Sequence, residues 1–155
     1  MGSFTHSVNS NFSLHRLNSL TASRIVKHPD VNFIVVVNPN TGPGDSPLPD
    51  GNYTREIPRL NSYPNVRTIG YVSTSGANRN LSSTVQDIST YSSWSKNITI
   101  PGLGVQGIFL DETPSVYTAA AVQFLNTISC VIVFQPEFEN NPLVCRVVPI
   151  HLFLV

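Results

Sequence analysis

Asp111 and Glu112 are the residues of this chain whose types and placement are best suited to chemistry. They close an apolar run, Gly107-Ile-Phe-Leu, that is typical of a buried strand, and Thr113-Pro114 follows at once. A pair of carboxyl groups, one protonated and one ionised, is what acid–base cleavage of a glycosidic bond requires. Three interpretations of the pair stay open at this point: catalysis, capping of the next helix, and binding of a metal ion.

The placement of the pair on a strand limits what both groups can do together. Neighbouring side chains of a regular strand point to opposite faces of the sheet. Both carboxylates can therefore reach one pocket only if the strand breaks here, which Thr113-Pro114 allows. Thr113 is a natural helix N-cap and Pro114 a natural first helical residue, so a helix is expected to begin there.

Two other predicted strands also end in polar residues. The run from Val31 to Val37 leads into Asn38-Pro39-Asn40, and the run from Val66 to Val72 has Tyr71 near its end. Asn38 and Asn40 could make an Asx turn or contact a ligand. Tyr71 could stack on a ligand or pack against a helix.

The order of the predicted elements brings these strand ends together. Helical spacing is seen from Asn52 to Tyr63, after the capping-box pattern Ser83 to Gln86, and after Pro114, while Cys130 to Phe134 reads as a further strand. Tyr91 and Trp94 are expected in the core. Alternating strands and helices predict a parallel α/β sheet, whose carboxyl-end loops form sites in open sheets and barrels. The candidate site residues at those ends are Asn38, Asn40, Tyr71, Asp111 and Glu112.

Composition excludes several classes of function. The 155 residues suit one domain, and the nine basic and nine acidic residues give zero net charge with no basic stripe, which argues against nucleic acid as a partner. The four histidines are scattered, so no metal site is predicted, and no cofactor is expected. No strand is followed by a glycine-rich nucleotide-binding motif. No apolar stretch has the length of a membrane span.

The cysteines and the first residues are less informative. Cys130 and Cys145 are either a disulfide pair or two buried thiols. The first 20 residues contain no apolar run of signal-peptide length, so they predict no compartment. Residues 1–24 are rich in serine and asparagine and are expected to be weakly ordered.

Four motifs in register give the chain a resemblance to a known family. It resembles the spherulin 4 (spherulation-specific family 4) proteins, which are similar to glycoside hydrolase family 135. The resemblance runs from about His28 to about Ile128, and its motifs are Val31 to Gly44, Pro64 to Thr74, Tyr91 to Trp94, and Gly107 to Pro114.

The resemblance implies a fold and an activity. The family fold is a (β/α)₈ barrel, and its characterised activity is endo-hydrolysis of α-1,4-linked galactosamine-containing polysaccharide in fungi. By resemblance, Asp111 and Glu112 are the catalytic acid and the nucleophile or transition-state stabiliser, in an order left open, and Asn38, Asn40 and Tyr71 line the cleft. A polysaccharide or oligosaccharide is then the partner. Secretion or display at the cell surface is compatible with the family.

The sequence also departs from the family. A full barrel needs eight strand–helix units, whereas about four are recognisable here, so a truncated barrel is predicted. The expected division is a weakly ordered segment over residues 1–24, a partial barrel over residues 25–135 and an atypical tail over residues 136–155. No family strand is recognisable before Ala22. The alternative function is a non-catalytic carbohydrate-binding or developmental structural protein with an incomplete active site.

Overall fold

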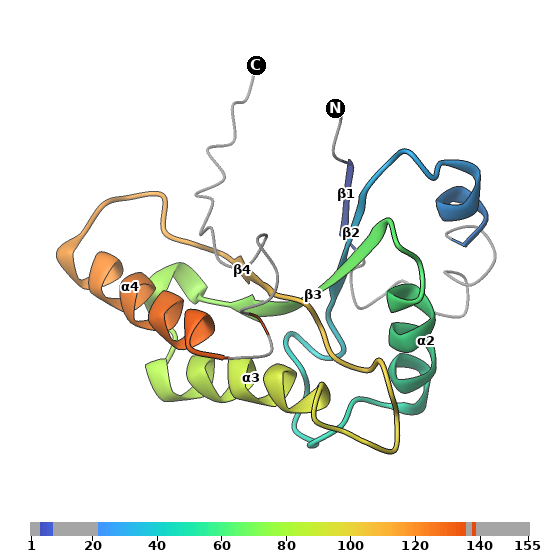
Figure 1. The fold of residues 1–155 in the computed structure, drawn as a ribbon. Helices are drawn as coiled ribbons and strands as arrows, with labels where there is room; N and C mark the ends of the chain where they lie inside the picture. Colours follow the sequence, from blue (N-terminus) through green and yellow to red (C-terminus); the bar gives the residue numbers. More distant parts are fainter. Residues whose placement is uncertain (1–3, 8–21, 136–137, 139–155) are drawn as a thin grey trace.

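The structure is a parallel α/β sheet whose strands follow one another in sequence order (Figure 1). The computed structural model describes residues 4–7, 22–135 and 138. A short helix spans residues 22–27. The other elements, in chain order, are β1 (Phe4–Ser7), β2 (Phe33–Val37), α2 (Gly51–Asn61), β3 (Val66–Ser73), the one-turn helix η1 (Ser75–Ala77), α3 (Leu81–Trp94), β4 (Ile108–Asp111) and α4 (Ala119–Val133).

The sheet has four parallel strands in the order β1-β2-β3-β4. Phe4 pairs with Phe33, Val37 with Gly70, and Ser73 with Asp111. The strand β1 lies within residues 1–24, where the sequence pattern predicts no strand. It is hydrogen-bonded to β2 along its whole length, and this pairing is a long-range contact that the local sequence does not predict. The parallel α/β prediction itself is confirmed.

The described helices all pack on one face of the sheet. Strand side chains alternate between faces, and Val35, Val37, Val66 and Val72 share the covered face. In Figure 1, α3 lies below β3 and β4, α4 lies to the left of β4, and α2 lies to the right. The helical partners of this face are Ile25, Ile57, Ile88, Tyr91, Trp94, Ile128 and Ile132. On the other face, which we call the open face, Arg67, Ile69 and Tyr71 of β3 are only half-buried.

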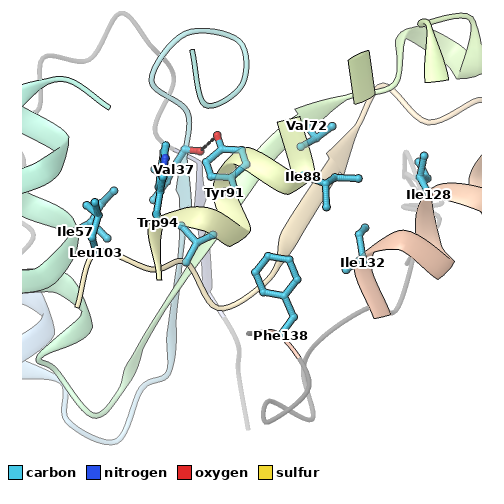
Figure 2. Close-up of a cluster of buried hydrophobic side chains, with 11 residues drawn as sticks. Val37, Ile57, Val72, Ile88, Tyr91, Trp94, Leu103, Ile128, Ile132 and Phe138 are labelled. Atoms are coloured by element: carbon cyan, nitrogen blue, oxygen red, sulfur yellow. Dashed lines mark hydrogen bonds between the residues drawn. The ribbon is translucent and has the colours of Figure 1, made fainter. Parts of the chain in front are cut away.

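Tyr91 joins the helical layer to the strands, and Figure 2 shows its hydroxyl donating to the carbonyl of Val37 at 2.9 Å. Its ring meets Trp94 edge-on, with centroids 4.7 Å apart, so the prediction that both belong to the core is confirmed. A Cβ added to Gly70 would lie 2.7 Å from the ring of Tyr91. The close approach of this ring therefore requires glycine at position 70.

Two helix boundaries differ from those predicted. The helix α3 is capped by Asn80, whose Oδ1 accepts the backbone N–H of Ser83 at 3.2 Å, rather than by the Ser83 capping box. The helix α4 is capped by Thr118, whose Oγ1 accepts from Ala121 at 3.1 Å, rather than by Thr113. In both cases local sequence offered more than one hydroxyl or amide cap, and packing selected among them.

The predicted strand from Cys130 to Phe134 is wrong, because α4 continues through this segment to Val133. The run is rich in β-branched residues and suggested a strand. However, Ile128 and Ile132 are one helical turn apart and both are buried against the core, so the helix propagates instead. Cys130 is an exposed free thiol on this helix, while Cys145 lies outside the described residues.

Candidate functional site

The carboxyl ends of β3 and β4 place aromatic and carboxylate side chains next to one another. Tyr71 pairs with Phe109 in register, and their ring centroids are 6.2 Å apart. The next pair on the same face is Ser73 with Asp111. Because partners in a parallel sheet point to the same side, Tyr71, Phe109, Ser73 and Asp111 form one cluster on the open face.

The carboxylate of Asp111 interacts with the backbone of the next residue and with the phenol of Tyr71. Its Oδ1 accepts the backbone N–H of Glu112 at 2.8 Å. Desolvation, then a side-chain hydrogen bond to Asp111, then the charges of Asp111 and Glu112 raise the pKa of Tyr71 to about 12, against an opposing effect of Arg79. The phenol therefore keeps its proton at neutral pH, and Tyr71 is a standing hydrogen-bond donor at the site.

Glu112 adopts a backbone conformation that few residues of its type adopt. Its φ of 53° is left-handed, so the strand breaks at Glu112 itself, one residue before the predicted break. Its Oε2 accepts the hydroxyl of Ser73 at 2.5 Å and lies 3.5 Å from that of Ser75. Both carboxylates thus lie at the open face of β3, Asp111 opposite Ser73 in register and Glu112 through its bond with the Ser73 hydroxyl.

Arg79 supplies a cation beside this cluster. It forms an ion pair with Asp87 at 2.7 Å and donates to the carbonyl of Ser73 at 3.1 Å. Its charge opposes the rise in the pKa of Tyr71, which places it within electrostatic reach of the phenol. The sequence patterns singled out neither Arg79 nor Ser73, although Ser73 stands at the end of the strand that carries Tyr71.

Asn38 and Asn40 are placed differently from the carboxylates. Asn38 is buried, its Oδ1 accepts the backbone N–H of Gly42 at 2.9 Å, and its carbonyl accepts the hydroxyl of Tyr53 at 2.9 Å. Asn40 is exposed on the same loop. In the described part of the chain, no hydrogen bond joins either asparagine to Asp111 or Glu112. The side-chain oxygen of Asn38 therefore serves the turn.

Backbone strain is concentrated at this edge of the sheet. Among the described residues, the non-glycine residues with positive φ are Thr41, Ser75, Ala77 and Glu112. They fall in the segments that follow β2, β3 and β4, at the carboxyl ends of the strands. Strained conformations of this kind persist where surrounding structure holds them, and they cluster at functional sites.

Other features of the described residues lie apart from these strand ends. An open groove of about 430 Å³ runs along α4 and is lined by Tyr117, Ala119, Val122, Gln123, Asn126, Thr127 and Cys130, none of which is a predicted site residue. No group of three or more histidine, cysteine or acidic side chains suited to a metal ion occurs within the described ranges. No helix found there is long and apolar enough to span a bilayer.

Comparison with known proteins shows the family of the chain. The profile of the spherulation-specific family 4 matches residues 18–146. The chain belongs to the spherulation-specific family 4. Within this family, it is 42% identical to Spherulin-4 of Physarum polycephalum over 82 residues, which are 53% of this chain and 22% of Spherulin-4.

A solved structure extends the likeness to three dimensions. The chain is similar to Aspergillus clavatus Sph3, crystallised in complex with GalNAc, with 52% sequence identity and a TM-score of 0.69. The match covers 72% of this chain and 44% of the Sph3 chain. The chain thus spans less than half the length of each of these two relatives.

Proposed function

We propose that this chain carries part of the active site of a glycoside hydrolase that acts on galactosamine-containing polysaccharide. In this proposal Asp111 and Glu112 are the catalytic carboxyl groups, one as acid and the other as nucleophile or transition-state stabiliser. The observation that carries the proposal is that both carboxylates lie on one face of β3, Asp111 opposite Ser73 in register and Glu112 bonded to the Ser73 hydroxyl. Kinship with a protein crystallised with GalNAc supports the choice of sugar.

The proposed fold is a partial (β/α)₈ barrel over residues 25–135, to whose sheet β1 adds a strand from outside that range. Two observations support it: the strands are parallel and in sequence order, and the described helices cover one face only. A doubly wound sheet would carry helices on both faces. In a barrel the open face becomes the interior, and the carboxyl ends of the strands form the site.

Tyr71 is the proposed sugar contact with the best geometry. Its ring is half-buried beside Phe109, and its hydroxyl keeps a proton at neutral pH because its pKa is about 12. A sugar ring can pack on the aromatic surface, and a sugar hydroxyl can donate to the phenol oxygen, whose own proton is directed at Asp111. Asn40, exposed on the loop after β2, is a second proposed contact, whereas Asn38 contributes through the shape of that loop.

The experiment is incubation of the purified 155-residue chain with α-1,4-linked galactosamine-rich polysaccharide, followed by measurement of released oligosaccharide. Asp111→Asn and Glu112→Gln should each lower the rate of release by about 10²- to 10⁴-fold. Asp45→Asn, a matched change at an exposed loop residue after β2, should not. Equal release by the wild type and both site variants would refute catalysis by this pair.

A second candidate function is carbohydrate binding without catalysis. It is favoured by the span of the chain, which matches 44% of Sph3, so that part of a family active site can lie in the unmatched portion. Titration of the chain with oligosaccharides of N-acetylgalactosamine distinguishes the two functions. Saturable binding that Tyr71→Ala weakens, with no release of oligosaccharide, would establish the binding function.

A further inference from the structure

The residues that end β3 form a hydrogen-bonded clamp around the residues that end β4. Thr74 is fully buried and Ser73 is 6% exposed. Their hydroxyl groups are directed at Asp111 and Glu112, which lie 37 to 39 positions away in sequence. We call Ser73, Thr74 and Gly76 the β3 clamp.

Thr74 and Gly76 hold the backbone of the carboxylate pair. The N–H of Thr74 donates to the carbonyl of Asp111 at 3.0 Å, and its Oγ1 lies 2.9 Å from that same carbonyl and 2.8 Å from the carbonyl of Glu112. The N–H of Gly76 donates to the Glu112 carbonyl at 2.7 Å. The carbonyl groups of Asp111 and Glu112 are therefore both hydrogen-bonded to residues at the end of β3 or just after it.

Ser73 holds the side chain of Glu112 rather than its backbone. Its Oγ donates to Oε2 of Glu112 at 2.5 Å, while Ser75, at 3.5 Å from the same oxygen, is at the limit of a hydrogen bond. Arg79 in turn donates to the carbonyl of Ser73 at 3.1 Å and is fixed by its ion pair with Asp87. The serine hydroxyl is thus presented from a supported backbone.

The clamp decides on which face Glu112 lies. A regular extended residue at position 112 would direct its side chain away from the face that carries Asp111. A left-handed φ is disfavoured for glutamate because its Cβ crowds the neighbouring carbonyl oxygen, so it persists only where surrounding contacts enforce it. The described contacts that can do so are the local bond from the Glu112 N–H to Oδ1 of Asp111 and the cross-strand bonds of the β3 clamp.

We infer that Ser73 and Thr74 are positioning residues for the carboxylate pair. Thr74 fixes the left-handed backbone of Glu112, and Ser73 fixes the direction of its carboxylate, so that both carboxylates serve one substrate. This inference rests on the proposed function for its chemical meaning, and on the hydrogen bonds alone for its structural content.

The kinetic test uses Ser73→Ala, with Ser73→Thr as the conservative variant that keeps the hydroxyl. Its matched control is Ser93→Ala, at an exposed serine of α3 whose hydroxyl bonds its own helix. On galactosamine-rich polysaccharide, Ser73→Ala should lower kcat by about 10- to 100-fold with KM within about twofold, since a misdirected catalytic group costs rate rather than binding. Ser93→Ala and Ser73→Thr should stay within about threefold of wild type. An equal loss in Ser73→Ala and Ser93→Ala would overturn the assignment of Ser73.

A second measurement does not depend on activity and separates the two proposals. Crystal structures of the wild type, Ser73→Ala and Thr74→Val should show Glu112 left-handed in the wild type, its carboxylate displaced in Ser73→Ala, and its φ negative in Thr74→Val. Thr84→Val, at a buried threonine of α3 whose hydroxyl bonds its own helix, controls for the loss of a buried hydroxyl.

The outcomes of the two measurements are distinct. A wild type that releases no oligosaccharide refutes the proposed hydrolysis, and the crystal structures then decide the positioning role by themselves. An unchanged Glu112 in both Ser73→Ala and Thr74→Val refutes the positioning role even if hydrolysis is established. If Thr74→Val does not fold, Ser73→Ala alone decides through the place of the Glu112 carboxylate.

Discussion

The two ends of the strands use their polar side chains in opposite ways. At the amino ends, Asn65 before β3 directs its Nδ2 at the carbonyls of Ile25, His28 and Val31, at 3.5, 3.2 and 3.0 Å. At the carboxyl ends, Asp111 accepts from the next residue and Glu112 from a neighbouring strand, and the two residues are half-buried and exposed, respectively. At the amino ends the polar side chain donates to backbone carbonyls, whereas at the carboxyl ends the acidic side chains are accessible to solvent.

A second asparagine at the amino ends follows the same pattern. The Nδ2 of Asn61 lies 2.8 Å from the carbonyls of both Gly102 and Gly104, and its Oδ1 accepts from Thr68 at 2.7 Å. These amides tie the segments that lead into the strands to one another. Non-glycine residues with positive φ are found, among those described, only beyond the carboxyl ends. In α/β barrels the same division separates stability from chemistry.

The largest expected effect is at the carboxyl ends. Asp111→Asn keeps the shape and the acceptor for the Glu112 N–H, so the free energy of unfolding should change by less than about 0.5 kcal/mol. Hydrolysis of galactosamine-rich polysaccharide should fall by about 10²- to 10⁴-fold, because the group can no longer transfer a proton or carry charge. Chemical denaturation and initial rates check the two parts. If Asp111→Asn lost stability and activity together, Asp111 would have a structural role like that of the asparagines at the amino ends, and the contrast between the two ends would fail.

The next effect is at the amino ends, where Asn65→Ala leaves backbone carbonyls without their donor. The free energy of unfolding should fall by about 2 kcal/mol, while sugar binding and hydrolysis by the folded fraction stay unchanged. Asn32→Ala, an exposed asparagine just before β2, is the matched control and should change stability by less than about 0.5 kcal/mol. Equal stability of the two variants in urea titration would contradict a structural role for Asn65.

A smaller effect measures the strain at Glu112. Glu112→Gly and Glu112→Ala both remove the carboxylate, but only glycine adopts a φ of 53° without a Cβ penalty. The glycine variant should therefore be more stable than the alanine variant by about 1 kcal/mol in thermal or urea unfolding. At Asn32 the same pair of changes should show no such preference for glycine. An alanine variant as stable as the glycine variant would show that Glu112 carries no strain.

The smallest effect is on the titration of Tyr71. Its pKa is raised from 10.0 to about 12 by desolvation and by Asp111, so Asp111→Asn should lower it, as followed by phenolate absorbance. Because the folded-state pKa lies above the unfolded value, the stabilisation by Tyr71 is complete below pH 10 and is lost as pH rises through 12. Tyr71→Phe should remove its part of this loss, which leaves the parts of the half-buried Tyr53 and the buried Tyr91, whose pKa values are also raised. If the pKa of Tyr71 is the same in Asp111→Asn as in the wild type, Tyr71 and Asp111 do not interact.

Much of the fold could be predicted because its signal is local. The run Val31 to Val37 and the run Val66 to Val72 are apolar and β-branched, and they form β2 (Phe33–Val37) and β3 (Val66–Ser73). The segment after Ile128 was misassigned because its composition suits a strand while its spacing suits a helix, and the core favoured the helix. The strand β1 escaped prediction because four residues carry little pattern without their partner β2.

Some residues of the candidate site could likewise be predicted from local sequence, and others could not. Asp111, Glu112 and Tyr71 could be selected from sequence because each stands at the end of a predicted strand, and β3 and β4 proved to be neighbours. Asn38 was selected by the same argument, but its side-chain oxygen is taken up by Gly42, a contact made within the loop. Ser73 and Arg79 were missed, because neither residue type stands out until the register shows what it faces.

The sequence by itself determined which chemical groups stand at the strand ends and that those ends share one edge, since residue type, periodicity and chain order are written along the chain. Only the tertiary structure decided that the carboxylates of Asp111 and Glu112 lie on the same face of the sheet. That outcome depends on a left-handed residue held by Thr74 and Ser73 of the neighbouring strand. Backbone conformation at a strand break follows from hydrogen bonds between distant residues, and local sequence does not encode them.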